Sequence, residues 1–200
     1  MPDPQSPQSE VTSRLRAAAR AARAALDGAP RDRAQAAIAA RLVALPGLAT
    51  GTRLGWYLPT DGEVDLATAC APMRDRGVEL LLPVIGPERS LRFAPWQEAT
   101  PLHANRYGID EPVHSPDAAV TADELDAVVV PCVAVDPAGH RIGFGAGYYD
   151  RALASSSARR IGVVFEVQVV DHLEPAPWDV PLDLVLTEAR ELRADAHDPG

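Results

Sequence analysis

The sequence contains no lysine, and all 19 basic residues of the 200-residue chain are arginine. An arginine is a poor replacement for a lysine that acts as a compact point charge. Aspartate and glutamate number 28, which gives a formal net charge of −9. Nonspecific nucleic-acid binding needs clustered positive charge, and we therefore expect no nucleic-acid partner.

Cysteine and long apolar runs are also scarce. Cys70 and Cys132 are the two cysteines, and we expect both to be free, buried thiols in a reducing compartment. The five histidines show no ligand-like spacing to either cysteine, so we expect no zinc site. No apolar run approaches the roughly 20 residues that span a bilayer, and the first 30 residues lack the apolar core of a signal peptide. We expect a cytoplasmic, monomeric protein with no membrane partner.

The apolar periodicity predicts one α/β domain. Apolar residues make up 46% of the chain and charged residues 24%, as in soluble globular proteins. We expect tails at 1–9 and 189–200 around a core at 10–188. Helices are predicted at about 11–26, 33–45, 64–76 and 148–156, and strands at 53–59, 78–85, 90–96, 125–135, 160–166 and 184–188. This alternation predicts helices packed on a mostly parallel sheet.

Three polar loops follow predicted strands, at 59–65, 105–112 and 136–150. In sheets of this kind, ligands bind beyond the carboxyl ends of the strands. We therefore expect the three loops to meet at one edge of the sheet.

The third loop carries the stretch "RIGFGAGYYDRAL" (141–153), in which alternating glycines at 143, 145 and 147 follow Arg141. Backbone N–H groups without a Cβ nearby can approach a phosphate closely, and a following helix start adds a favourable dipole. Arg141 could contact a phosphate oxygen. The spacing matches neither the Walker motif nor the dinucleotide motif. The pattern fits a phosphate-binding loop and a plain tight turn equally well.

Other polar residues also allow two interpretations. Asp150 opens a predicted helix, where a carboxylate is favourable in itself, yet with a second carboxylate such as Asp179 it could bind magnesium. Glu63 is either a solvated loop acid or an acceptor for the N–H groups of an amino-pyrimidine. Tyr107 is either a stacking platform or a cover for the core.

Arg16, Arg20 and Arg23 form a stripe along the first predicted helix. Such a stripe is usually a solvated face, but it could instead close over a polyanion.

Taken together, these stretches resemble the 5-formyltetrahydrofolate cyclo-ligase family over about residues 12–188. The resemblance rests above all on "DPAGHRIGFGAGYYDRAL" (136–153). Supporting matches are "LR" (15–16), "YLPTDGEVD" (57–65), "LPVI" (82–85), "LRFAPW" (91–96), "YGIDEP" (107–112) and "WDVPLDLVLTE" (178–188).

The resemblance implies a three-layer α/β sandwich with a mostly parallel sheet, similar to sugar-phosphate isomerases and CoA transferases. It also implies the ATP- and magnesium-dependent conversion of 5-formyltetrahydrofolate to 5,10-methenyltetrahydrofolate, with release of ADP and phosphate. The formyl oxygen would be phosphorylated first, and the folate N10 would then attack the activated carbon and expel phosphate.

The resemblance also implies the residues of the site. It implies catalytic roles for Arg141, Tyr148 and Asp150, and a magnesium site at Asp150 and Asp179. ATP would contact Thr12, Ser13, Arg14, Leu15, Arg16, Arg141, Ile142, Gly143, Phe144, Gly145, Ala146, Gly147, Tyr148 and Tyr149. The folate would contact Leu58, Glu63, Tyr107, Phe144, Gly145, Ala146, Gly147 and Tyr148. Thr12 and Ala146 stand where relatives carry lysine, which removes positive charge near the expected phosphates.

Three other functions stay open on the sequence alone. The chain could be a binding module that keeps a folate or nucleotide pocket without turnover, and the missing lysines favour that reading. It could be a sugar-phosphate isomerase of related fold that needs no ATP. A nicotinamide-dependent oxidoreductase is disfavoured by the glycine spacing.

Overall fold

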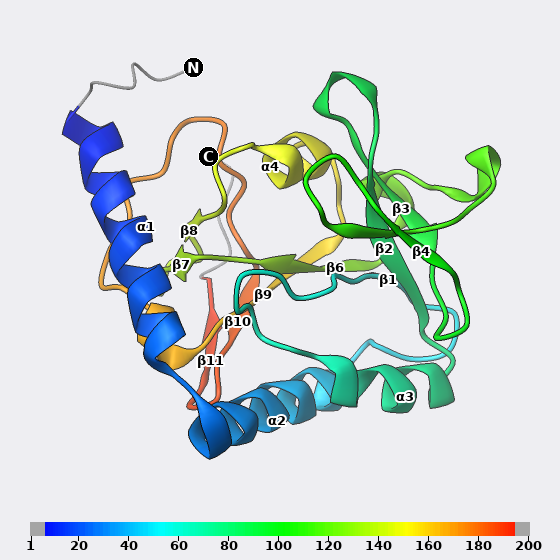
Figure 1. Ribbon diagram of the computed structural model, residues 1–200, viewed down its shortest axis with the longest axis horizontal. Coiled ribbons are helices and arrows are strands. Elements are labelled where there is room, and N and C mark those ends of the chain that lie inside the picture. The colour runs from blue at the N-terminus through cyan, green and yellow to red at the C-terminus, as the bar shows by residue number, and fades with distance from the viewer. Residues whose placement is uncertain (1–6, 195–200) are drawn as a thin grey trace.

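The computed structural model describes residues 7–194, and its centre is a seven-stranded sheet (Figure 1). Its strands are β1 (Arg53–Gly55), β2 (Glu79–Ile85), β3 (Leu91–Pro95), β6 (Ala127–Pro131), β9 (Arg159–Val163), β10 (Leu184–Leu186) and β11 (Glu191–Arg193). The strand order is β11-β10-β9-β6-β1-β2-β3. The inner pairs from β10 to β2 are parallel, whereas β11 and β3 join the two edges antiparallel. The prediction of a mostly parallel sheet is therefore confirmed.

Helices cover both faces of this sheet. The four α-helices are α1 (Pro7–Ala25), α2 (Gly28–Ala44), α3 (Ala67–Asp75) and α4 (Tyr148–Leu153). In Figure 1, α2 and α3 lie below the sheet and α4 lies above it. The first helix, α1, stands across one end of the sheet, beside the strands β7 (Ala134–Val135) and β8 (Arg141–Ile142). The three layers agree with the expected architecture, and the likeness to sugar-phosphate isomerases and CoA transferases stays a prediction.

The central strand β6 shows why its sequence is continuously apolar. Val128 and Val130 belong to the core cluster on the α4 side, which includes Phe93 and Leu153. Val129, which points the other way, belongs to the cluster under α2 and α3. Both faces of this strand are covered, so the residues on both faces are apolar. In a sheet with one solvated face, every second residue would instead be polar.

Several predicted boundaries are wrong. The predicted strand at 125–135 is two strands, because the chain turns at Cys132–Val133 and continues as β7, which pairs with β8. The predicted loop at 97–120 contains a hairpin of β4 (Leu102–Ala104) and β5 (Asp110–Pro112). The predicted strand at 53–59 ends at Gly55. Single turns of 3₁₀ helix complete the secondary structure: η1 (Pro87–Arg89), η2 (Pro116–Ala118), η3 (Ala122–Glu124) and η4 (Glu166–Gln168).

Parts of the two predicted tails belong to regular secondary structure. Residues 7–9 belong to α1, and β11 forms the sheet edge at 191–193, inside the predicted tail at 189–200. The other tail residues, 1–6 and 195–200, lie outside the described part of the chain. Cys70 and Cys132 are free and buried, as predicted. Within residues 7–194, no helix is long and apolar enough to cross a membrane.

The turn between β7 and β8 depends on a close backbone approach at Gly139. Its φ is +87°, and a Cβ at this position would lie 2.4 Å from the carbonyl oxygen of Leu182. Gly47 has the same φ, but a Cβ there would meet no atom within 4 Å. The two positions therefore separate backbone strain from collision.

We predict that Gly139→Ala destabilises the fold more than Gly47→Ala does. Both variants pay the left-handed strain of roughly 1–3 kcal/mol, and Gly139→Ala must in addition move the chain at Leu182. Urea unfolding of the two variants and the parent measures the difference. Equal losses would show that the approach at Leu182 relaxes without cost.

Candidate functional site

The arginines of α1 bind two loops that are far apart in the sequence. Arg16 Nε donates to the carbonyl oxygen of Gly143 at 3.1 Å. Arg20 donates through Nε and Nη2 to Oδ2 of Asp61, at 2.8 and 2.5 Å. The Arg20 guanidinium also lies 5.7 Å from the ring centroid of Phe144, next to the first of these contacts. Loop 59–65 and loop 143–147 therefore meet under one face of α1.

Arg23 is the buried member of this stripe, with a relative exposure of 1%. Its Nη2 donates to the backbone oxygen of Asp61 at 2.6 Å and to Oδ2 of Asp61 at 2.9 Å. Its Nη1 is buried and has no hydrogen-bond partner among residues 7–194. From α2, Arg31 Nη2 donates to the carbonyl oxygen of Gly62 at 2.5 Å. The backbone of loop 59–65 is thus fixed by guanidinium groups from two helices.

Glu63 is a buried carboxylate in loop 59–65, with a relative exposure of 5%. Its Oε2 accepts from the backbone N–H of Thr60 at 2.9 Å, while its Oε1 is buried and has no partner in the described part of the chain. Burial raises the pKa of Glu63 to about 7, against the opposing effects of the Thr60 hydrogen bond and of Arg23. Burial, and next the charge of Glu63, raise the pKa values of Tyr57 and Tyr149. Glu63 is therefore close enough to Tyr149, at the start of α4, to affect its pKa, and one oxygen of Glu63 is unpaired.

The base of the glycine loop is held by the buried side chain of Asp136. Its Oδ1 accepts from the backbone N–H of His140, and its Oδ2 accepts from Nδ1 of His140 and from the backbone N–H of Leu173, each at 2.9 Å. Beyond this base, Gly145 and Gly147 have φ values of +96° and +67°, which residues with a side chain rarely adopt. The loop thus presents bare backbone between β8 and α4.

Arg141 differs from the mobile charge that its place in the sequence suggests. Its side chain is buried, its Nη1 donates to the carbonyl oxygen of Val180, and its Nη2 donates to Oδ1 of Asp150 at 2.5 Å. The backbone N–H of Val180 also donates to Oδ1 of Asp150, at 3.3 Å. Asp179 is the neighbour of Val180, and its Oδ2 accepts from the backbone N–H of Ala176. Both expected metal ligands therefore lie around the same segment, and Arg141 fixes one of them.

The β4–β5 hairpin, which the sequence did not predict, brings Tyr107 next to Tyr148 at the end of the glycine loop. The hydroxyl oxygens of Tyr107 and Tyr148 are 3.1 Å apart, and their rings meet edge to face. Arg106 Nη2 donates to the Tyr148 hydroxyl at 2.9 Å. The hydrogen bond with Tyr107, and next the one from Arg106, lower the pKa of Tyr148. Arg151 Nη2 donates to the carbonyl oxygen of Ala146 at 2.8 Å. All three predicted loops thus meet, as expected.

Other expected site residues lie apart from these contacts or are packed into the core. Arg14 is exposed and pairs with Glu10 at 2.6 Å along α1. Leu15 and Ile142 pack together with Ala19 in a small apolar cluster. Leu58 packs against the core under α2 and α3. Thr12 is half-buried and Ser13 is exposed on α1.

The sequence-based site omitted Arg20, Arg23, Asp61, Arg106 and Arg151. The arginine stripe at i, i+4 and i+7 was the available signal for the first two, because such residues share one helix face.

The sequence model of the 5-formyltetrahydrofolate cyclo-ligase family matches residues 8–188. This chain belongs to that family. A 5-formyltetrahydrofolate cyclo-ligase of Mycolicibacterium smegmatis is 34% identical over 145 residues, covering 69% of this chain and 74% of the relative. One of Haemophilus influenzae is 33% identical over 131 residues, covering 63% and 70%. A solved structure of Aquifex aeolicus 5,10-methenyltetrahydrofolate synthetase has a TM-score of 0.78 and 30% identity, covering 95% of this chain and all of that chain.

This cyclo-ligase family member has one ion pair at the site and another outside it that differ in burial. Arg23 and Asp61 are 2.9 Å apart with the Arg23 side chain 2% exposed, whereas Arg14 and Glu10 are 2.6 Å apart with both side chains more than 60% exposed. Removing one partner of a buried pair leaves a charge without compensation, but exposed pairs contribute little.

We therefore predict that Asp61→Asn lowers the free energy of unfolding by about 1–3 kcal/mol, because Asp61 is half exposed and only Arg23 is fully buried. Asparagine tolerates the φ of +49° at this position, so the loss reports the charge and not the backbone. Glu10→Gln is the matched control and should change stability by less than about 0.5 kcal/mol. Similar effects in the two variants would mean that loop 59–65 does not depend on Asp61.

The second prediction concerns the pH dependence of stability at Glu63. Between the ordinary pKa of 4.5 and the raised value of about 7, the folded state binds a proton that the unfolded state has lost. Glu63 therefore costs stability as the pH rises through this window, by up to about 3 kcal/mol. Glu63→Gln cannot ionise, so its stability relative to the parent should increase between pH 5 and pH 8. A difference that stays constant with pH would contradict the raised pKa.

Proposed function

We propose that this chain converts 5-formyltetrahydrofolate to 5,10-methenyltetrahydrofolate at the expense of ATP, with magnesium bound beside the nucleotide. One observation carries the proposal above all. A buried carboxylate with a free oxygen, Glu63, and a bare glycine loop, 143–147, are held next to each other by the same helix. The first suits an amino-pyrimidine and the second suits a polyphosphate, so two ligands would meet there.

The folate side of the site would be recognised by Glu63. Its Oε1 has no partner in residues 7–194, and the ring of a pterin carries N–H groups that need an acceptor. Leaving a buried polar atom unpaired costs roughly 1–3 kcal/mol, which a matching ligand group would recover. Tyr107 would cover the ring edge from the hairpin, and Leu58 would shape the wall behind loop 59–65.

The nucleotide side would use the loop backbone and the arginines around it. Arg16 Nε is bound to the Gly143 carbonyl, so its Nη groups stand over the loop, with Nη2 within 3.7 Å of where a Gly145 Cβ would lie. Guanidinium groups bind phosphate oxygens in pairs of hydrogen bonds. Arg16 would therefore supply positive charge at the phosphates, and Arg141 would act by fixing Asp150.

Asp150 and Asp179 fit a magnesium ion that is shared with nucleotide phosphates. Oδ2 of Asp150 and Oδ1 of Asp179 have no hydrogen bond within the described residues. No group of three or more His, Cys, Asp or Glu residues in 7–194 could hold an ion by itself, and magnesium commonly takes only one or two carboxylates besides phosphates. When bound, the ion would neutralise charge on the transferred phosphoryl group.

In this mechanism the protein positions two ligands and stabilises charge. The formyl oxygen attacks the γ-phosphorus, forming an O–P bond while the bond to ADP breaks. N10 of the folate then attacks the formyl carbon and loses its proton, and the C–O bond breaks to release phosphate, which can carry that proton away. Arg16 and the loop N–H groups would hold the phosphoryl oxygens, while Tyr148, fixed by Tyr107 and Arg106, would stand beside the reacting groups. Cys132 takes no part, because burial raises the pKa of its thiol to about 12.

Formation of the methenyl product, followed by its ultraviolet absorbance, tests the proposed function. Product should form only when 5-formyltetrahydrofolate, ATP and magnesium are all present. Binding of the folate and ATP without ADP release would instead support a binding module. Product formation without ATP would contradict the proposal.

The route of the phosphoryl group gives a separate prediction. With substrate that carries heavy oxygen in the formyl group, one turnover should place the label in inorganic phosphate, because that oxygen leaves bonded to phosphorus. Mass spectrometry of the released phosphate measures the transfer. Label found in water or retained in folate would contradict the phosphorylated intermediate.

The two aspartates give the third prediction for function. Asp179→Asn should lower activity and recover partly at high magnesium, because asparagine keeps the size but loses the charge that the ion prefers. Asp150→Asn should behave likewise and in addition lose about 1–3 kcal/mol of stability, since Arg141 stays buried without its partner. Full activity of both variants at low magnesium would remove them from the metal site.

A further inference from the structure

Three exposed arginines gather around Tyr148, at the end of the glycine loop. Arg106, from the β4–β5 hairpin, donates to the Tyr148 hydroxyl at 2.9 Å, and its Cζ lies 5.0 Å from the ring centroid of Tyr107. Arg151, from α4, has its Cζ 5.5 Å from the Tyr148 ring centroid, and its Nε donates to the carbonyl oxygen of Arg89 at 3.4 Å. The pKa of Tyr148 is lowered by its hydrogen bonds with Tyr107 and Arg106, and also by the charges of Arg106 and Arg89. Three separate segments therefore bring positive charge to one place.

These arginines have no acidic partner. Among residues 7–194, no carboxylate forms an ion pair with any of the three, and the side chain of Arg89 makes no hydrogen bond. Arg14 and Arg20 are also exposed, but they pair with Glu10 and Asp61. The chain as a whole has a net charge of −9. Because like charges that are held together repel one another, a bound anion would stabilise this cluster.

The backbone that carries Arg89 is in a conformation that needs support. Glu88 and Arg89 have φ values of +53° and +59°, in the left-handed region that residues with a side chain rarely adopt. Within the described residues, Asp61 in loop 59–65 is the other non-glycine residue with a positive φ. Such conformations are unfavourable and occur mainly at ligand sites. All three residues adjoin the candidate site.

The proposed reaction supplies an anion of a suitable kind, and the inference rests on that proposed function. Beyond N10, 5-formyltetrahydrofolate carries a p-aminobenzoyl ring and then a glutamate group with carboxylates. Glu63 would hold the pterin, and the formyl group would meet the glycine loop. N10 must reach the formyl carbon, so the p-aminobenzoyl ring that is bonded to N10 also starts at this loop. That ring would lie against Tyr107 and Tyr148, and the glutamate group would extend to the exposed arginines beyond them.

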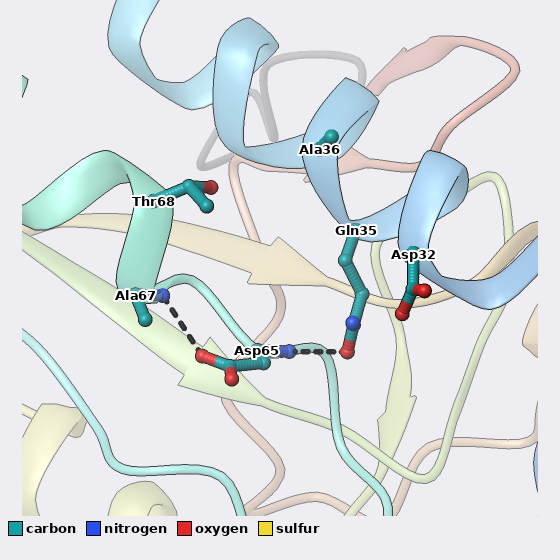
Figure 2. A pocket seen from close by; sticks show the side chains of 6 residues that line it. All are labelled: Asp32, Gln35, Ala36, Asp65, Ala67 and Thr68. Atoms are coloured by element: carbon teal, nitrogen blue, oxygen red, sulfur yellow. Dashed lines mark hydrogen bonds between the residues drawn. The ribbon is translucent and has the colours of Figure 1, made fainter. Parts of the chain in front are cut away.

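The hollows on the α2 and α3 side of the sheet are less suitable for an anionic group. Figure 2 shows one of them, of about 170 Å³, between α2 and the start of α3. Asp32 and Asp65 contribute carboxylates to its lining, which contains no basic residue of the described chain. The larger cavity, of about 400 Å³, has two carboxylates, Asp65 and Glu98, and one basic residue, Arg74. Carboxylates repel an anion, so the cluster around Tyr148 is the more favourable place.

We propose that Arg89, Arg106 and Arg151 bind the carboxylates of the glutamate group of the folate, and so select substrates that carry this anionic end. A guanidinium group presents pairs of N–H groups that match the two oxygens of a carboxylate. Arg106 uses Nη2 to hold Tyr148, and its other N–H groups would bind the ligand. Because all three side chains are exposed, each contact contributes modestly and is screened by salt.

Binding of two related compounds without ATP tests the assignment. They are 5-formyltetrahydrofolate and 5-formyltetrahydropteroate, which is the same compound without its glutamate group. Isothermal titration calorimetry of the parent should show binding of the folate at least about 10-fold tighter than that of the pteroate, since each exposed charge contact contributes up to about 5-fold. This preference should decrease as salt is added.

An Arg89→Gln, Arg106→Gln double variant should reduce the preference to about 3-fold or less, because only one of the three contacts remains. Arg151 is kept, because it also binds the Ala146 carbonyl in the glycine loop. Comparing the two compounds within each protein cancels any effect of Arg106 on Tyr148, which both compounds share. Arg193→Gln is the matched control: Arg193 is exposed on β11 and pairs with Glu191, so its removal should leave the preference unchanged.

Equal binding of the two compounds by the parent, or the parent's preference in a folded double variant, would overturn the proposal. Thermal unfolding shows whether the double variant keeps the fold. If it does not, Arg89→Gln alone takes its place, and an unchanged preference there overturns the proposal. No ATP is present in these measurements. Lack of methenyl product in a protein that shows the preference would therefore contradict the proposed function and not this assignment, whereas binding of neither compound would contradict both.

Discussion

The guanidinium groups on one face of α1 hold the candidate site together. Arg16 binds the Gly143 carbonyl, and Arg20 and Arg23 bind Asp61. The two loops that carry these groups follow different strands and are about 80 residues apart in the sequence, so the sheet alone does not fix their separation. Because each contact is a charge-assisted hydrogen bond to backbone or carboxylate oxygen, one rigid helix sets the position of both loops. The missing lysines therefore leave a site organised by arginine.

The packing of α1 against the two loops also leaves polar atoms buried without partners. Nη1 of Arg23 and Oε1 of Glu63 are unpaired in the described part of the chain, and burial keeps the pKa of Glu63 near 7. Each of these features lowers stability. Proteins keep such local conflicts mainly at functional sites, where a ligand can supply the missing partner.

Most of the sheet could be predicted because burial on both faces leaves a clear pattern. Strand β6 is apolar at every position and was identified, as was β2. The hairpin of β4 and β5 was not predicted, because its strands are three residues long and all three residues of β4 are on the surface, so no apolar alternation marks it. What stabilises that hairpin is nonlocal: the buried Glu111 accepts from the N–H of Ile85, a contact that no local pattern encodes.

The arrangement of side chains around the glycine loop could likewise be predicted in part, and the rest could not be predicted for a similar reason. The glycine loop, Glu63 and Tyr107 are marked by local motifs, and the structure brings them together. The partners of Arg141 were not predicted, because an arginine before a glycine loop is typical of a phosphate ligand. Its contacts with Val180 and Asp150 depend on segments that are distant in the sequence. Arg20 and Arg23 were visible as a stripe, but whether a stripe faces solvent or a loop depends on where the helix docks. The central claim is that arginines of α1 hold both loops in place. Hydrogen exchange in an Arg16→Met, Arg20→Met double variant tests it most directly, with Arg14→Met as the control on the exposed face. The account predicts faster amide exchange in both 59–65 and 143–149, with exchange in β6 and β9 unchanged. Parent-like exchange in both loops would contradict it.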